Sequence, residues 1–212
     1  MAEAMTSIFG RRSLLTGALG LTGGAILPEE AWAVDALPTL PIAPLIAGSA
    51  DGAAVTADFI ADQLATANDQ FAPAGMSFAA SSPVSLDAKF RELETRADRD
   101  ALGASVVAHE ISVFFVASLR DVDDPKNFRM GVTWRKLTDL RVRYIIVASS
   151  ARTTTMAHEL GHFFGLDHSG VKNNLMSYDR DGGTVSMSES QLVTVRQHAA
   201  GAIARKDLVP RG

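Results

Sequence analysis

The stretch HELGHFFGLDH, residues 158–168, contains three of the chain's five histidines, one glutamate and two glycines. On a helix, His158 and His162 lie four positions apart on one face, so both imidazoles can reach a single point. Gly165 can adopt the left-handed conformation that ends a helix and turns the chain, which lets His168 approach that point from another side. Three neutral imidazoles that leave one position open form the ligand set of a catalytic zinc ion.

The residues around these histidines agree with a metal site. The chain contains no cysteine, so a metal must be held by histidines or carboxylates. Glu159 follows the first histidine, where its carboxylate can reach a water molecule beside the metal without being a ligand. The sequence therefore predicts Zn²⁺ held by His158, His162 and His168, with Glu159 as the general base. Three histidines with purely structural roles are the alternative.

The spacing HExxHxxGxxH is identified as the signature of the metzincin zinc metalloproteases, and all five of its fixed positions are present. The loop NNLMSY, residues 173–178, resembles the methionine turn of this family. The resemblance implies that Met176 forms an apolar floor beneath the three imidazoles. It also implies that Tyr178 approaches the zinc ion or the reacting carbonyl; a buried tyrosine without a catalytic role is the alternative.

Within this family, the pattern is closest to pappalysin-like and matrixin-like bacterial members. The stretch QLATANDQFAPAGMSF, residues 63–78, resembles the N-terminal helix and strand of the former, and Ser169 is similar to the residue that matrixins carry after the third histidine. The resemblance implies an α/β fold of the metzincin zincin type. Such a fold has a mixed twisted sheet, an active-site helix and a small C-terminal helical subdomain.

The function implied by the resemblance is zinc-dependent hydrolysis of internal peptide bonds in a protein or peptide substrate. A metal-activated water attacks the carbonyl, while Glu159 accepts its proton and returns it to the leaving amine. The substrate lies extended along an edge strand, for which Gly131, Val132 and Thr133 are the candidates. A zinc amidase that acts on cell-wall peptide or another non-protein amide is the first alternative. A non-catalytic zinc-binding module is the second.

Apolar stretches elsewhere in the chain predict strands, which are Pro41–Ala47, Met76–Ala80, Ile111–Leu119, Arg129–Arg135 and Arg143–Ser149. The third and the fifth are continuously apolar and β-branched, as is typical of strands covered on both faces. The fourth contains Gly131 and is expected at an edge of the sheet. The charged stretch Arg120–Asn127 is expected to be an exposed turn, because its aspartates do not have the spacing of a calcium loop.

Helical periodicity predicts four helices. The first begins near Thr56 and places one face inward, at Ile60, Leu64, Ala67 and Phe71. The second begins at Asp87 and directs three residues inward, Phe90, Leu93 and Ala97. The third begins near Thr153 and carries the histidine motif. The fourth begins with a capping box of Ser188 and Gln191, and its apolar stripe comprises Leu192, Val195, Ala199 and Ile203.

Composition limits the function classes. The net charge is −4 and there is no basic excess, so nucleic acid is not an expected partner. We expect one catalytic domain, residues 41–207, with an upper part 41–165 and a lower part 166–207, and a monomer. His109, at the start of a strand, and His198, in the last helix, lack metal-ligand spacing, which predicts structural roles for both.

Both ends of the chain carry patterns unrelated to the fold. Residues 1–33 resemble a twin-arginine export signal, with Arg11 and Arg12 before an apolar stretch; a general secretory signal is the alternative. This predicts a bacterial periplasmic or extracellular protein without a stable membrane span, preceded by an extended lead-in at residues 34–40. Latency, if present, would use a carboxylate such as Asp35 or Asp51, or obstruction by the N-terminal segment. LVPRG, residues 208–212, resembles a thrombin recognition sequence from an expression vector and is left out of the fold prediction.

Overall fold

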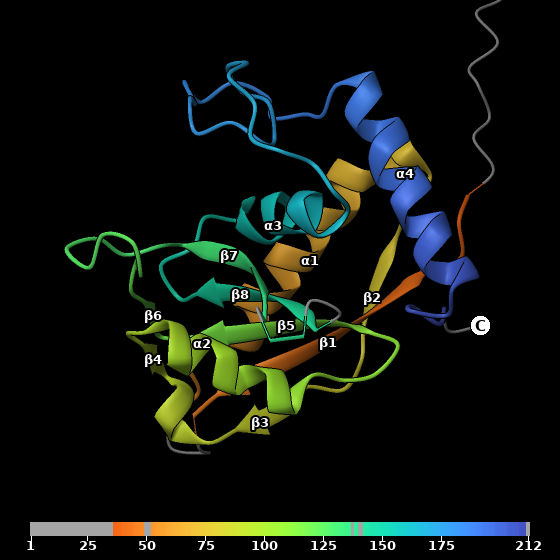
Figure 1. The fold of residues 1–212 in the computed structure, drawn as a ribbon. Coiled ribbons are helices and arrows are strands. Elements are labelled where there is room, and N and C mark those ends of the chain that lie inside the picture. The colour runs from red at the N-terminus through yellow and green to blue at the C-terminus, as the bar shows by residue number, and fades with distance from the viewer. Residues whose placement is uncertain (1–35, 49–51, 137, 140–141, 211–212) are drawn as a thin grey trace, which may run out of the picture. The chain divides into compact units, whose positions relative to one another are not determined.

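The computed structural model describes residues 36–48, 52–136, 138–139 and 142–210 (Figure 1). The export signal predicted for residues 1–33 and the two carboxylates considered for latency, Asp35 and Asp51, lie outside these residues. The extended lead-in is shorter than expected, because the first strand already begins at Leu40.

Six strands of the described residues form one mixed sheet in the order β2-β1-β5-β8-β7, with β3 also paired to β1. Their bounds are β1 Leu40–Ala47, β2 Phe78–Ala80, β3 Val84–Leu86, β5 Ile111–Val116, β7 Gly131–Arg135 and β8 Arg143–Ala148. All pairings are parallel except that of β7 with β8, which is antiparallel. The structure therefore confirms the mixed α/β fold and places β7 at an edge, as predicted.

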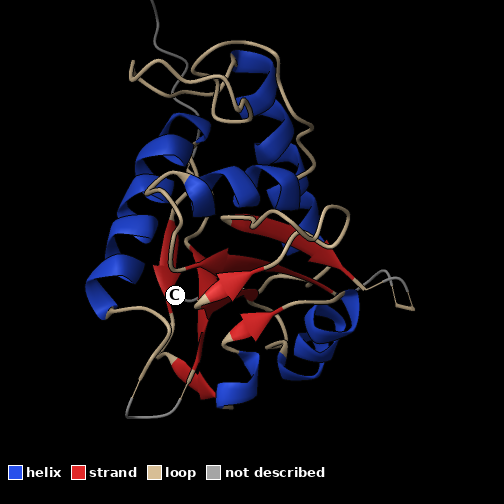
Figure 2. Ribbon diagram, turned by 90° about the vertical axis from the view of Figure 1, so that its left-hand side faces the viewer, coloured by secondary structure: helices blue, strands red, loops and turns tan. Residues whose placement is uncertain are grey.

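Both faces of this sheet are covered, as Figures 1 and 2 show. One face packs against helices α1 (Ala57–Phe71), α3 (Thr155–Phe163) and α4 (Glu189–Ala204). The apolar residues on the other face pack against the 3-10 helix η3 (Leu102–Ser105) and against the small parallel pair β4 (Glu92–Leu93) and β6 (Ser118–Leu119). Helix α2 (Arg96–Ala101) contacts this face through hydrogen bonds from the Trp134 and Tyr144 side chains. Successive residues of β5 alternate between the two cores, which explains why its sequence is continuously apolar.

Helix α1 forms as predicted and is followed by the 3-10 turn η1 (Ala72–Ala74). The Thr56 hydroxyl accepts a hydrogen bond from the Phe59 N–H at the start of the helix, which satisfies one of its free donors. At the other end Gly75 has a φ of 65°, a left-handed conformation that turns the chain into β2. The Phe71 ring then packs against the rings of Phe78 and Phe164.

The prediction of a helix that begins at Asp87 is wrong. The Asp87 side chain caps only a single 3-10 turn, η2 (Ala88–Phe90), and Leu93 lies in β4 instead. A second cap, the reciprocal capping box of Thr95 and Asp98, starts α2. Ala97 is consequently exposed rather than buried. The two N-terminal caps are only eight residues apart, so neither helical segment can continue through the other. Leu93 lies between them and pairs with Leu119 in a strand instead.

Several element boundaries also differ from the prediction. The expected strand Ile111–Leu119 is divided into β5 and β6, and the expected start of α3 near Thr153 moves to Thr155. His109 lies in a turn with a φ of 65° rather than in a strand, and its Nδ1 is 2.8 Å from the Lys206 carbonyl. Leu208 belongs to the stretch that resembles a vector-derived tail, yet it is 3% exposed and packs in the core.

Helix α4 confirms the predicted capping box of Ser188 and Gln191. Val195, Ala199 and Ala202 are buried, while Leu192 and Ile203 are partly buried against the same core. None of the helices in the described part of the chain is long and apolar enough to cross a membrane.

Candidate metal centre

The three histidines of the motif meet at one point. His158 and His162 lie on one face of α3, and their Nε2 atoms are 3.1 Å apart. The Nε2 of His168, which follows the helix, is 3.0 Å from that of His162. One nitrogen from each ring therefore falls within a group whose atoms all lie within 4.8 Å of one another.

The opposite nitrogens of two rings show which tautomer is present. The Nδ1 of His158 is 2.8 Å from the Leu175 carbonyl, and that of His162 is 2.7 Å from the Leu166 carbonyl. A carbonyl can only accept, so each Nδ1 carries a proton and donates it, and the Nε2 of each neutral ring presents a lone pair. Burial lowers the pKa of His158 to about 4 and also lowers that of His162, which favours these neutral forms.

Two facing lone pairs at this separation repel unless a cation lies between them. The nitrogens of a tetrahedral zinc site are about 3.3 Å apart when each Zn–N bond is about 2.0–2.1 Å. The observed spacings of 3.1 and 3.0 Å are close to that value. Carbonyl partners on the far nitrogens are also what zinc-binding histidines have. The donor set therefore fits Zn²⁺.

Gly165 makes the turn that brings His168 back to this point. Its φ is 88°, which favours glycine, and a Cβ there would lie 2.4 Å from Cε1 of His198. His198 on α4 therefore packs against the turn, and its nitrogens are not in the converging group. The sequence indicates that position 165 needs glycine for a left-handed turn. The tertiary structure adds a steric requirement, because His198 leaves no room for a Cβ.

The N-terminus of α3 is capped by a side chain from α1. Its N-terminal flank, Thr154, makes no side-chain cap, but the Oε1 of Gln63 on α1 accepts a hydrogen bond of 2.9 Å from the Met156 N–H. The Nε2 of the same side chain donates to the Arg152 carbonyl at 2.8 Å. Gln63 is fully buried, and these two bonds fix the segment that leads into the ligands. Periodicity placed position 63 on a helix but did not indicate this role.

The carboxylate of Glu159 is buried between α3 and β7. Glu159 is 6% exposed, and burial raises its pKa to about 7, although hydrogen bonds from Thr133 favour the charged form. The Thr133 hydroxyl lies 3.0 Å from Oε2 and 2.6 Å from the Glu159 carbonyl. A carboxyl group with this pKa can both accept and release a proton near neutrality.

The edge strand β7 lies directly against α3 at this residue. A Cβ on Gly131 would be 2.7 Å from Cγ2 of Thr155 and 3.0 Å from Cγ of Glu159. Glycine is therefore the residue that allows the two elements to approach this closely. The outer edge of β7, which includes Val132, has no strand partner among the described residues.

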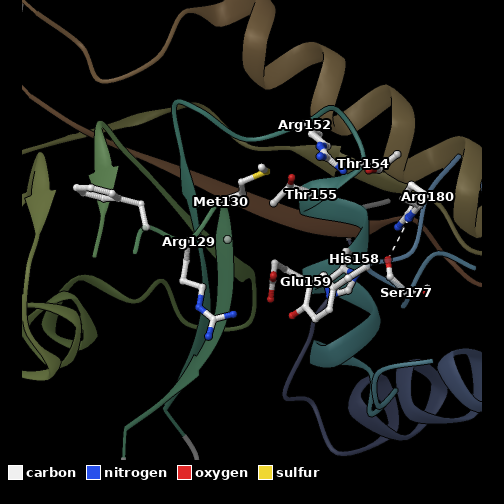
Figure 3. A pocket seen from close by; sticks show the side chains of 12 residues that line it. Arg129, Met130, Arg152, Thr154, Thr155, His158, Glu159, Ser177 and Arg180 are labelled. Carbon is white, nitrogen blue, oxygen red and sulfur yellow. Dashed lines mark hydrogen bonds between the residues drawn. The ribbon is translucent and has the colours of Figure 1, made fainter. Parts of the chain in front are cut away.

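Two cavities flank the centre, and four residues line both of them: Arg129, Gly131, Glu159 and Tyr178. The first has a volume of about 360 Å³ and reaches His158 (Figure 3). The second has a volume of about 500 Å³ and reaches His162 and His168. The converging nitrogens thus lie between two open spaces, as a site for an extended ligand requires.

Solved structures share the fold of this chain. Mature mirolysin from Tannerella forsythia in complex with a cleaved peptide has a TM-score of 0.53 and 12% sequence identity, and the match covers 84% of this chain and 99% of mirolysin. A promirolysin mutant from the same organism gives a TM-score of 0.56 at 10% identity, covering 84% of this chain and 85% of its own. Archaemetzincin from Methanopyrus kandleri gives a TM-score of 0.52 at 11% sequence identity, and the match covers 82% of this chain and 99% of archaemetzincin. This chain has a metzincin-type fold.

No protein-family model matches the chain, and no curated protein matches its sequence. The similarity to solved structures lies in the fold, at sequence identities too low to distinguish subfamilies. The likeness to pappalysin-like and matrixin-like members therefore stays a prediction.

Met176 lies in a tight turn at residues 174–177, which is closed by a hydrogen bond of 2.9 Å from the Ser177 N–H to the Asn174 carbonyl. Met176 is fully buried, and its N–H donates to the Asn174 side chain at 2.9 Å. The Asn174 amide exchanges two hydrogen bonds with the amide of Gln191, at 2.7 and 3.1 Å. The turn is thereby attached to the N-terminus of α4. Asn174 was not among the predicted site residues, since an asparagine in a loop has no spacing that marks it.

Tyr178 is not a buried tyrosine. It is 68% exposed, and its hydroxyl lies 2.8 Å from Nε2 of His168. That nitrogen has no hydrogen of its own when it is available as a ligand, so the tyrosine hydroxyl is the donor in this contact. The structure therefore brings together all the predicted site residues: the three histidines, Glu159, Tyr178, Met176 beside the helix, and the Gly131–Thr133 edge.

Proposed function

We propose that this protein is a zinc-dependent endopeptidase. The observation that carries the proposal is the convergence of three imidazole Nε2 atoms beside the buried Glu159 carboxylate, at a cleft bordered by an open strand edge. The metzincin-type fold supports it, because mirolysin, whose structure contains a cleaved peptide, has the same fold.

The residues of the chain have separable roles in this proposal. When bound by the three histidines, zinc would polarise the substrate carbonyl and lower the pKa of water. Glu159 accepts the proton of the attacking water and delivers it to the leaving amine. Thr133 orients that carboxylate. The Tyr178 hydroxyl donates a hydrogen bond toward the oxygen on which negative charge develops.

The substrate class follows from the strand edge. The free edge of β7 can form main-chain hydrogen bonds with an extended peptide of any sequence, adjacent to the buried carboxylate. Such pairing favours a protein or peptide substrate over other amides.

Metal analysis combined with digestion assays tests the proposal. We expect about one zinc per chain, cleavage of casein, loss of cleavage with a chelator, and recovery on addition of zinc. Glu159→Ala should retain zinc and lose nearly all activity. Undiminished cleavage by this variant would contradict the mechanism. Hydrolysis of peptidoglycan but not of casein would favour the amidase, and bound zinc without hydrolysis of any substrate would favour the non-catalytic module.

We also propose export by the twin-arginine route and a monomeric state, which rest on the sequence of residues 1–33 and on composition. Replacement of Arg11 and Arg12 by lysines should abolish export of the folded protein in bacterial cells. Export that persists after this change would favour the general secretory route. Light scattering of the purified protein would measure its oligomeric state.

A further inference from the structure

The first cavity beside the metal centre has an unusual charge distribution. Its volume of about 360 Å³ is within the range of about 300–1,000 Å³ that is typical of ligand pockets. The apolar side chains of Phe128 and Met130 lie at its rim and are 54% and 41% exposed. Three arginines, Arg129, Arg152 and Arg180, contribute to its walls, while Glu159 is its one acidic wall residue.

Of the three arginines, Arg129 already has an acidic partner. Its Nε lies 2.7 Å from Oδ2 of Asp121, which is buried. Arg152 and Arg180 are in no ion pair with the described residues. Burial and the charge of Arg152 both lower the pKa of Arg180, so the two cations are close enough to repel each other.

The guanidinium of Arg180 is held in place by the backbone. Its Nε donates to the Ser177 carbonyl at 3.0 Å, and its Nη2 donates to the Leu175 carbonyl at 2.8 Å. These two bonds leave three of the five N–H donors of a guanidinium for another ligand. Figure 3 shows Arg152 and Arg180 close to the first turn of α3, Arg152 from the segment before the helix and Arg180 from the loop after Met176. A fixed guanidinium of this kind suits a carboxylate, which it can bind through two parallel hydrogen bonds.

We propose that this cavity binds the carboxylate side chain of an aspartate or glutamate that flanks the cleaved bond of the substrate. The proposal rests on the proposed peptidase function and assigns it a specificity. Arg180 binds the carboxylate, Arg152 adds a second positive charge at the cavity wall, and the apolar rim contacts the methylene groups of the side chain.

Cleavage-site profiling with a peptide library tests this assignment. We expect aspartate or glutamate to be enriched at one position next to the cleaved bond. In matched peptides, glutamate at that position should give a kcat/KM about tenfold higher than glutamine, as expected for a charge-assisted hydrogen bond. The ratio should fall as the salt concentration rises.

Arg152→Glu is the most informative variant, because the Arg152 side chain is exposed, whereas Arg180 shares the Leu175 carbonyl with His158. This variant should reduce the preference for glutamate over lysine by about tenfold or more. Lys89→Glu makes the same change of charge on η2, outside the cavity wall, and should leave the preference as it is. A preference that moves equally in both variants would overturn the proposal.

Peptide binding separates this proposal from the proposed function. Fluorescent versions of the glutamate, glutamine and lysine peptides would be titrated into the zinc-loaded Glu159→Gln variant, and we expect the glutamate peptide to bind most tightly. Cleavage without any acidic preference would overturn the cavity assignment and leave the peptidase function intact. Preferential binding of the glutamate peptide without cleavage by the unchanged protein would support the cavity assignment and contradict the peptidase function. Absence of both cleavage and preferential binding would overturn the cavity assignment and the peptidase function together.

Discussion

Gly161 and Met176 are in such close contact that a Cβ on Gly161 would lie 2.4 Å from Sδ of Met176. Gly161 is on α3 between the two helical histidines, and Met176 is in the turn attached to α4. The methionine therefore lies against the helix between its two ligands. Gly161 is the first glycine of the motif, for which the sequence alone indicates no role, and this contact supplies one.

Gly161→Ala should weaken zinc binding and reduce stability. The added methyl group must displace Met176 or the helix, and overpacking of this kind costs about 1–3 kcal/mol. We expect a lower urea midpoint for the metal-free protein and a weaker zinc affinity in competition with a chelating dye. Gly170→Ala is the control, because a Cβ there meets no atom within 4 Å. Equal behaviour of the two variants would show that the contact with Met176 is unimportant.

Thr133→Val should shift the pH dependence of activity. The Thr133 hydroxyl stabilises the charged form of Glu159, so its removal raises the pKa of this carboxyl further. The acidic limb of the kcat/KM profile should move to higher pH by about half a unit to one unit. Thr194→Val, which removes a hydroxyl bonded to Ser190 on α4, serves as the control. An unchanged acidic limb in Thr133→Val would argue against this role.

Gln63→Met should destabilise the protein without touching the metal centre. It keeps a side chain of similar length but leaves the buried Met156 N–H without its acceptor, which costs about 1–3 kcal/mol. Urea unfolding of the metal-free protein measures the loss. Gln197→Met, at an exposed position of α4, should be nearly neutral. Equal stability of the two variants would contradict the proposed cap.

The metal-free protein should lose stability as the pH falls from about 6.5 toward 4. Burial lowers the pKa of His158 to about 4 in the folded chain, whereas its ordinary value is 6.5. The unfolded chain therefore binds the proton first, and the contribution of the neutral ring is lost across that interval. His158→Gln should show a smaller loss of stability over the same range. Identical pH dependence in the two proteins would contradict this assignment.

The strands could be predicted because apolar periodicity reports which residues are buried. β1, β7 and β8 begin or end within about two residues of their predicted positions, and Gly131 correctly indicated an edge. The segment after Asp87 could not be predicted in this way, because a cap signal shows where a helix can begin but not how long it continues. Its length depends on the partner of Leu93, which is 26 positions further along the chain.

The convergence of the three histidines could be predicted from the sequence alone. His158, His162 and His168 are related by helical geometry and one glycine turn, which are local properties, so short-range spacing was sufficient. The tertiary structure alone decided how that site is supported and what charge surrounds it. Gln63 caps α3 from 93 positions away, Thr133 reaches Glu159 from 26 positions away, and Arg152 and Arg180 meet beside one cavity. Such contacts arise from the packing of whole elements, and the spacing of residues along the chain carries no record of them.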